Sequence, residues 1–438
     1  MPGIEENMEA AYDPNSLPSL LPIYYKYIFP YGPFCKWLFY GTTAGSESLF
    51  EKREFSFTLQ NDIYVRYQSF ATQAEFGKEL KKMNPCKIDI GAIYSAPPKH
   101  RNRVSGGAFK PLTKELVFDI DMTDYDDVRK CCQGADICKK CWTLMSIAIK
   151  IINRALKDDF GFKNILWVYS GRRGVHCWVC DEKARALSPH ARSSIVEYLS
   201  LIQAGNHEKR VSLKDPVHPY IRNCHQVIRS YWDQYAIEDQ GFLEEDKDIA
   251  KVLKLIPDLD VREKVEKHFA GKNSAERWKK LKEICSAAYE SDPKRNRKLR
   301  YVSHEIMMEF CFPRLDVNVT KGVNHLLKSP FCVHPKTGRV CVPIDVSKVD
   351  EFDPFSVPTI SELCIEVERS EMPPEESETQ DKETPDAETP SASKKLLSLF
   401  RKTSLQNYMK PFDSLLEQLQ NDVPAKNLIA QSDLKGDF

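Results

Sequence analysis

Alternating polar and apolar positions predict several β-strands in the first third of the chain. Residues 54–59 and 62–70 alternate on either side of a Gln-Asn turn, a pattern typical of a β-hairpin. In the stretch 116–121 (LVFDID), one face is apolar and the other carries Asp119 and Asp121. These carboxylates need a chemical explanation, because burying an unpaired charge is costly.

Helical and strand patterns then follow one another along the chain. Apolar residues in 144–156 recur at helical spacing. Residues 165–170 and 175–179 flank a Gly-Arg-Arg-Gly turn and predict a second hairpin. Ser188, which is followed by proline, is typical of the start of a helix.

The rest of the pattern predicts an α+β fold. Residues 205–310 show no strand alternation and are interpreted as a helical insertion, after which 314–320 (RLDVNVT) alternates again and predicts a last strand. The order β-α-β-β-α, helical insertion, β is that of a split βαβ sheet, as in RNA-recognition motifs (RRM-like). In that topology the last strand lies beside the first, and the strand carrying His176 lies on the first strand's other side.

This topology would bring Asp316 next to Asp119 and Asp121. Three carboxylates on one face of a sheet can share two divalent cations about 3.5–4 Å apart, the arrangement of two-metal phosphoryl-transfer sites. Mg²⁺ is the expected ion and Mn²⁺ a plausible substitute, because both accept carboxylate and phosphate oxygens. A single Asp-x-Asp pair at a strand end is more often solvated, so the third aspartate carries much of the interpretation.

Basic groups concentrate in the second hairpin and in a later loop. The turn YSGRRGVH combines a hydroxyl, two guanidiniums, an imidazole and glycine backbone, which suits a polyphosphate. The stretch HLLKSPFCVHPKTGR adds a lysine and a histidine. Arginines in a turn are often no more than solvated surface. The candidate phosphate-binding residues are Ser170, Arg172, Arg173, His176, Lys328 and His334.

Four cysteines predict a metal site close to the first aspartates. Cys131, Cys132, Cys138 and Cys141 form the pattern C-C-x5-C-x2-C, and four thiolates can complete a closed tetrahedral Zn²⁺ site. Unpaired cysteines in a loop and disulfide bonds are the alternatives. We favour structural zinc, because a reducing compartment seldom leaves four thiols so close without a metal.

Composition limits the class of protein. Of the 438 residues, 42% are hydrophobic, and the 14 cysteines are too dilute for a disulfide scaffold. Apolar runs are too short to span a membrane, and the acidic N-terminus is unlike a signal peptide, so we expect an intracellular protein without a membrane partner. The net charge is zero, yet residues 366–390 hold ten acidic residues against two basic ones. The remaining chain is therefore mildly basic, which is compatible with a nucleic-acid partner.

The same patterns divide the chain into five parts. The acidic stretch has too few apolar residues to fold and is interpreted as a disordered linker, while helical periodicity returns after it. The expected parts are a catalytic domain in two pieces (1–204, with the zinc motif at 131–141, and 311–365), the helical insertion (205–310), the linker (366–393) and a C-terminal helical segment (394–438).

Several of these motifs, in this order, resemble the family of catalytic small subunits of eukaryotic DNA primase. They are LVFDIDMTDYDDVRKCC, the four-cysteine knot, YSGRRGVHCWV, RLDVNVTKGVNHLLKSPF and VHPKTGR. The likeness runs from about Leu20 to Cys364 and, more loosely, through the C-terminal SDLKGDF. It implies the primase fold and a nucleotidyltransferase that makes short RNA primers de novo on single-stranded DNA, a DNA-directed RNA polymerase of the primosome.

The resemblance also implies residue roles and partners. Asp119, Asp121 and Asp316 match the catalytic metal ligands, and the basic residues named above match nucleotide-phosphate contacts. Arg66 and Asp89 match the nucleotide pocket, with Asp89 a candidate for the ribose hydroxyl, and Glu54 matches without independent support from the strand pattern. The implied partners are a large primase subunit, the catalytic and accessory subunits of DNA polymerase α, the DNA template, the RNA primer and ribonucleoside triphosphates, in the nucleus.

Two other functions stay open at this point. One is an RRM-like nucleic-acid-binding module with a structural zinc and no chemistry. The other is a metal-dependent nuclease that uses the same carboxylates.

Overall fold

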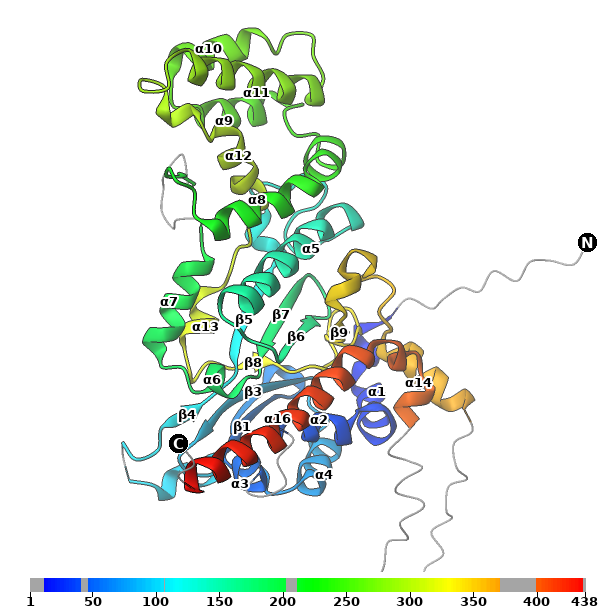
Figure 1. Ribbon diagram of the computed structural model, residues 1–438. Helices are drawn as coiled ribbons and strands as arrows, with labels where there is room; N and C mark the ends of the chain where they lie inside the picture. The colour runs from blue at the N-terminus through cyan, green and yellow to red at the C-terminus, as the bar shows by residue number, and fades with distance from the viewer. Residues whose placement is uncertain (1–11, 41–45, 106, 202–210, 371–398, 436–438) are drawn as a thin grey trace, which may run out of the picture.

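The protein has an α+β fold, as predicted, with two antiparallel sheets and a stack of helices at one end (Figure 1). The computed structural model describes residues 12–40, 46–105, 107–201, 211–370 and 399–435.

The first sheet has the order β2-β1-β3-β4, with β8 beside β3. Its strands are β1 (Arg53–Thr58), β2 (Tyr64–Gln68), β3 (Lys87–Tyr94), β4 (Pro111–Thr113) and β8 (Leu327–Lys328). The predicted hairpin is confirmed, because β1 and β2 pair antiparallel. Its connection is a 3-10 turn, Gln60–Asp62, rather than two residues.

The second sheet has the order β5-β7-β6-β9. Its strands are β5 (Leu116–Asp121), β6 (Ile165–Tyr169), β7 (Gly174–Val179) and β9 (Pro343–Ile344). The hairpin β6–β7 and the pairing of β7 with β5 are as predicted. Between β5 and β6 runs α5 (Lys139–Arg154), which binds β6 through a hydrogen bond from Trp167 Nε1 to Asn153 Oδ1 (3.2 Å).

The predicted last strand over 314–320 is wrong. Asp316 is instead the N-cap of a short helix, α13 (Val317–Lys321), and its Oδ1 accepts hydrogen bonds from the backbone N–H groups of Asn318 (2.9 Å) and Val319 (3.4 Å). The capping aspartate outweighs an alternation of only three apolar residues. The fourth strand of the sheet is β9, and it lies beside β6, far from β5. Asp316 nevertheless lies beside Asp119, because Asp316 N donates to the carbonyl of Asp119 (3.0 Å).

Helices cover the two sheets. Ser188 caps α7 as predicted, with its Oγ accepting from Ala191 N (3.2 Å). Around the sheets lie α1 (Leu17–Ile23), α2 (Tyr31–Leu38), α3 (Ser46–Glu51), α4 (Gln73–Met83), α6 (Glu182–Arg185), α7 (Pro189–Leu199) and α14 (Ile360–Arg369).

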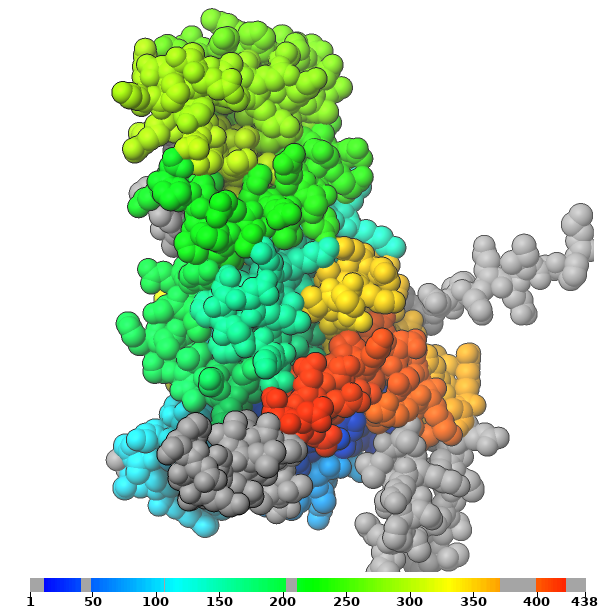
Figure 2. Space-filling view, viewed as in Figure 1, coloured from blue at the N-terminus to red at the C-terminus, as the bar shows by residue number. Residues whose placement is uncertain are grey.

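The segment between α7 and α13 is helical, as its pattern predicts. It contains α8 (Pro219–Trp232), α9 (Asp246–Lys254), α10 (Leu259–Lys267), α11 (Ser274–Ser291) and α12 (Val302–Cys311). Figures 1 and 2 show these helices stacked in green to yellow-green beyond the second sheet. The division of the chain into domains stays a prediction.

A pair of histidines joins two of these helices. The rings of His225 on α8 and His304 on α12 lie 3.8 Å apart, and His225 Nε2 is buried without a hydrogen-bond partner. Burial first, then the charges of His304 and Arg229, lower the pKa of His225 to about 4; burial and Arg229 also lower the pKa of His304. Both rings are therefore neutral at pH 7.

We expect this pair to make the protein sensitive to mild acid. A histidine whose pKa falls on folding stabilises the fold above its unfolded pKa of about 6.5 and loses that contribution as the pH falls toward 4. The unfolding temperature should therefore drop less between pH 7 and pH 5 in His225→Gln than in the unaltered protein. Calorimetry at the two pH values checks this, and an equal drop in both proteins would contradict it.

The C-terminal helix returns to the body. In α16 (Lys410–Lys435), Phe412 packs edge-on against Trp37 and Phe331, and Leu415 is buried. Figure 2 shows α16 in orange-red across the body. The predicted linker begins too early, since residues 366–369 form the end of α14 and Ser370 is its C-cap; the remainder, 371–393, lies outside the described residues. Within the described residues, no helix is long and apolar enough to cross a membrane.

Candidate active site

A polar cavity of about 360 Å³ lies between the two sheets and brings together most of the predicted site residues. It is lined by Lys87, Asp89, Asp119, Asp121, Ser170, Arg172, Arg173, His176, Val319, His325, Leu326, Leu327, Lys328, His334 and Pro335. Both sheets contribute, since Asp119 comes from β5 of the second sheet, whereas Lys328 on β8 pairs in register with Asp89 on β3 of the first.

Strand β5 places two carboxylates at the cavity. Asp119 lies in register with His176, whose Nε2 is 3.6 Å from Asp119 Oδ1. Burial first, then the negative charges of Asp121 and Asp316, raise the pKa of Asp119 to about 7, and Lys328 opposes this rise. Such crowding of negative charge costs free energy that a bound cation would relieve.

Asp121 is engaged by groups of its own neighbourhood. Arg173 Nε donates to both carboxylate oxygens (2.8 and 2.9 Å). Thr123 donates to Oδ1 through its backbone N–H (2.9 Å) and its hydroxyl (2.7 Å). The Asp121 carboxylate is therefore paired with the guanidinium of Arg173 at the end of β5.

Asp316 lies next to the cavity and is not one of its lining residues. Its side chain is exposed and caps α13, but its charge reaches Asp119 strongly enough to raise that pKa. In the described part of the chain, the carboxylate oxygens of the three aspartates do not lie as close to one another as the sulfurs of the four cysteines do. Like charges repel, and Asp121 and Asp316 each have hydrogen-bond donors elsewhere.

The turn between β6 and β7 is held against a later loop. Gly171 has φ +86°, and a Cβ there would lie 2.7 Å from Cβ of His334, so a side chain is excluded on both grounds. Thr337 Oγ1 donates to Gly171 O (2.6 Å), and Lys328 Nζ donates to Ser170 O. These contacts place the two arginines of the turn and the amine of Lys328 on the same cavity.

Two of the three histidines that line the cavity, His176 and His334, are neutral at physiological pH. Burial first, then the charge of Lys328, lower the pKa of His176 and of His334 to about 3. His334 Nδ1 accepts from Lys336 N (3.2 Å), so the proton of this ring sits on Nε2 and is available to an anionic oxygen.

The predicted nucleotide-pocket residues are separated by the structure. Asp89 is buried in the cavity, with Lys87 Nζ 3.1 Å and the Tyr64 hydroxyl 3.3 Å from its carboxylate. Arg66 pairs with buried Glu54 (3.0 Å) and is not a lining residue. Sequence reasoning missed Lys87 as a lining residue, although its alternation with Asp89 along β3 was available as a signal.

The four predicted zinc ligands come together. Their sulfur atoms all lie within 4.8 Å of one another, and those of Cys138 and Cys141 are 3.9 Å apart. A tetrahedral zinc site with Zn–S bonds of about 2.3 Å has its sulfurs about 3.8 Å apart, so the cluster fits such an ion. A hydrogen bond with the Cys141 thiol lowers the pKa of Cys131 to about 5, which favours a thiolate. Cys177 and Cys180, a second C-x2-C pair, are both buried.

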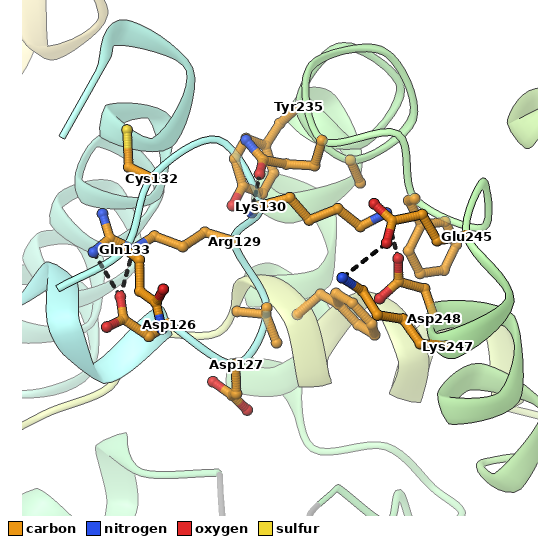
Figure 3. Close-up of a pocket in the computed structure, with 15 residues that line it drawn as sticks. Asp126, Asp127, Arg129, Lys130, Cys132, Gln133, Tyr235, Glu245, Lys247 and Asp248 are labelled. Carbon is orange, nitrogen blue, oxygen red and sulfur yellow. Dashed lines mark hydrogen bonds and ion pairs between the residues drawn. The ribbon is translucent and has the colours of Figure 1, made fainter. Parts of the chain in front are cut away.

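A larger cavity, of about 480 Å³, lies between the cysteine loop and the helical segment. Figure 3 shows that its charged groups are already paired: Arg129 with Asp126, and Lys130 toward Glu245 and Asp248. None of the three predicted catalytic aspartates lines it.

Comparisons with known proteins agree on one family. A family model described as DNA primase small subunit matches residues 118–346. The DNA primase small subunit of Drosophila melanogaster is 43% identical over 367 residues, covering 82% of this chain and 83% of the relative. That of Schizosaccharomyces pombe is 40% identical, over 79% and 77%. The DNA primase small subunit PriS of Thermococcus sibiricus is 26% identical, over 56% and 67%.

Proposed function

This chain belongs to the DNA primase small subunit family, and on that premise we propose that the cavity between its two sheets is the site of RNA primer synthesis. The observation that carries the proposal is the meeting of two crowded carboxylates with a cationic turn, since nucleotidyl transfer needs both. The reaction joins ribonucleoside triphosphates de novo on a single-stranded DNA template.

The carboxylates are proposed to hold the catalytic ions. Asp119, Asp121 and Asp316 would bind two Mg²⁺ or Mn²⁺ ions, which when bound lower the pKa of an attacking 3′-hydroxyl and stabilise the leaving oxygens. The pKa of about 7 at Asp119 means that its carboxylate is ready to exchange a proton for a cation near neutral pH.

The basic groups are proposed to bind and orient the triphosphate. Arg172, Arg173 and Lys328 line the cavity and would neutralise charge as it builds on the phosphates. His334 would donate its Nε2 proton to a phosphate oxygen, and the Ser170 hydroxyl lies in the same turn. On β3, Asp89 would accept from a ribose hydroxyl, with Arg66 acting from beside the cavity.

The cysteine cluster is proposed to hold a structural Zn²⁺ ion. Four sulfurs leave no open coordination position, so the ion would fix the loop at 131–141 rather than take part in the reaction.

The proposed setting follows from the family. The relatives are named small subunits, which supports a primase complex with a large subunit. We extend this to the catalytic and accessory subunits of DNA polymerase α, to a DNA template and an RNA primer, and to the nucleus, on the resemblance of the motifs.

A binding module and a nuclease remain the alternatives to exclude. RRM-like modules stack bases on exposed aromatic residues of their central strands. Here the paired positions on β5 and β7 hold Asp119 and His176.

Incubation with poly(dT), ATP and Mg²⁺ or Mn²⁺ distinguishes the three functions. We expect short RNA chains that begin without a primer, because the site can bind a triphosphate beside the carboxylates. Degradation of the template without RNA synthesis would indicate the nuclease. Binding of poly(dT) with neither reaction would indicate the binding module.

A further inference from the structure

Gln240 joins the helical segment to the cysteine loop. It directly follows the helical turn Asp233–Asp239, and only 6% of its surface is exposed. Its Oε1 accepts from the backbone N–H groups of Lys130 (2.7 Å) and Cys131 (3.3 Å). Since these partners can only donate, the amide must turn its Nε2 to the other side, where it donates to Cys131 Sγ (3.3 Å).

Lys130 adds a second polar link beside this glutamine. Lys130 Nζ donates to Gly241 O (2.9 Å) and pairs with Asp248 at the start of α9. Figure 3 shows Lys130 reaching from the loop toward the helical segment across the larger cavity. The larger cavity lies between the cysteine loop and the helical segment, and the hydrogen bonds of Gln240 and Lys130 connect the two beside it.

The opposite half of the cysteine loop is held from within. Arg129 is buried and donates to Asp136 O (2.7 Å) and Gly134 O (2.8 Å), and its Nη1 lies 3.8 Å from Cys141 Sγ. The Cys131 end instead receives its donor from a residue more than 100 positions later in the sequence.

A donor to a metal-bound sulfur orients the ligand and offsets its negative charge. Gln240 does this to Cys131 Sγ while also fixing the backbone that carries the sulfur. We propose that Gln240 is a positioning residue for the metal of the four cysteines, and that it couples occupancy of this site to docking of the helical segment. The inference rests on the proposed zinc site and concerns no step of primer synthesis.

The rate of zinc loss to a chromogenic chelator tests the first half of the proposal. We expect Gln240→Ala to weaken zinc retention about 10- to 100-fold, as loss of an outer hydrogen bond to a metal ligand typically does. Gln240→Glu should lose zinc at least as fast as Gln240→Ala, because it places a carboxylate against a thiolate. Gln234→Ala is the matched control, since Gln234 is an exposed glutamine of the helical turn that Gln240 follows.

Hydrogen exchange of the unaltered full-length protein tests the second half. After zinc is stripped, we expect the amides of residues 233–242 to exchange faster, and zinc readdition to restore their protection. Unchanged exchange there, or zinc loss from Gln240→Ala at the control rate, would overturn the proposal. Absence of zinc from the purified protein would instead refute the proposed metal itself, so the two failures are distinguishable.

Discussion

Asp121→Asn is expected to reduce primer synthesis about 1,000-fold or more, because a lost metal ligand removes several kcal/mol of transition-state stabilisation and each 1.36 kcal/mol is a factor of ten. Asparagine keeps an oxygen that can accept from Thr123, so the end of β5 should hold its shape. RNA formed on poly(dT) from labelled ATP gives the rate, and circular dichroism with thermal unfolding reports the fold.

Asp158→Asn is the matched control for that substitution. Asp158 is exposed and pairs only at the surface with Arg154 (3.3 Å), so the same chemical change there should leave the rate unchanged. Asp121→Asn retaining more than a tenth of the unaltered rate, with a native spectrum, would refute the role of this carboxylate.

Lys328→Ala is expected to lower the rate of primer synthesis by about 100- to 1,000-fold, the usual cost of removing one preorganised donor to developing charge. The positive charge of Lys328 acts on three groups of the cavity, since it lowers the pKa of Asp119, His176 and His334. It also donates to the Ser170 carbonyl and so supports the turn that carries the arginines.

The split between kcat and KM identifies what Lys328 does. A group that stabilises charge only in the transition state lowers kcat, whereas one that binds the triphosphate equally in both states raises KM alone. We expect a fall in kcat with a smaller rise in KM for ATP. Lys348→Ala, at an exposed lysine 3.8 Å from Glu351, is the control; equal activity of the two variants would contradict the assignment.

Local sequence patterns predicted those parts of the site whose chemistry lies within one element. The alternation in 116–121 placed Asp119 and Asp121 on one face, and the strand patterns on either side of the turn before His176 predicted that turn. The cysteine cluster was predictable as well, because the spacing within a single loop suffices to bring four sulfurs together.

Long-range features were harder to predict. Strands β8 and β9 are two residues each, too short for any periodicity. Asp89 and Lys328 were named as site residues, but their pairing across the first sheet was not predicted. The neighbourhood of Asp316 was correctly predicted from an incorrect strand, because a helix cap and an edge strand can place one residue beside Asp119.

The arrangement of the carboxylates shows why the sequence pattern alone does not predict the geometry of the metal-bound site. Asp121 binds Arg173 and Asp316 caps α13, whereas burial first and then the charges of these two aspartates raise the pKa of Asp119. Binding two cations would require these side chains to turn toward one another.

Anomalous diffraction from crystals grown with Mn²⁺ and a non-hydrolysable ATP analogue would locate the catalytic ions. We expect two manganese peaks about 3.5–4 Å apart, bound by Asp119, Asp121 and Asp316 with the triphosphate against Lys328 and the turn arginines. Manganese bound elsewhere, or a triphosphate outside the cavity between the sheets, would contradict it.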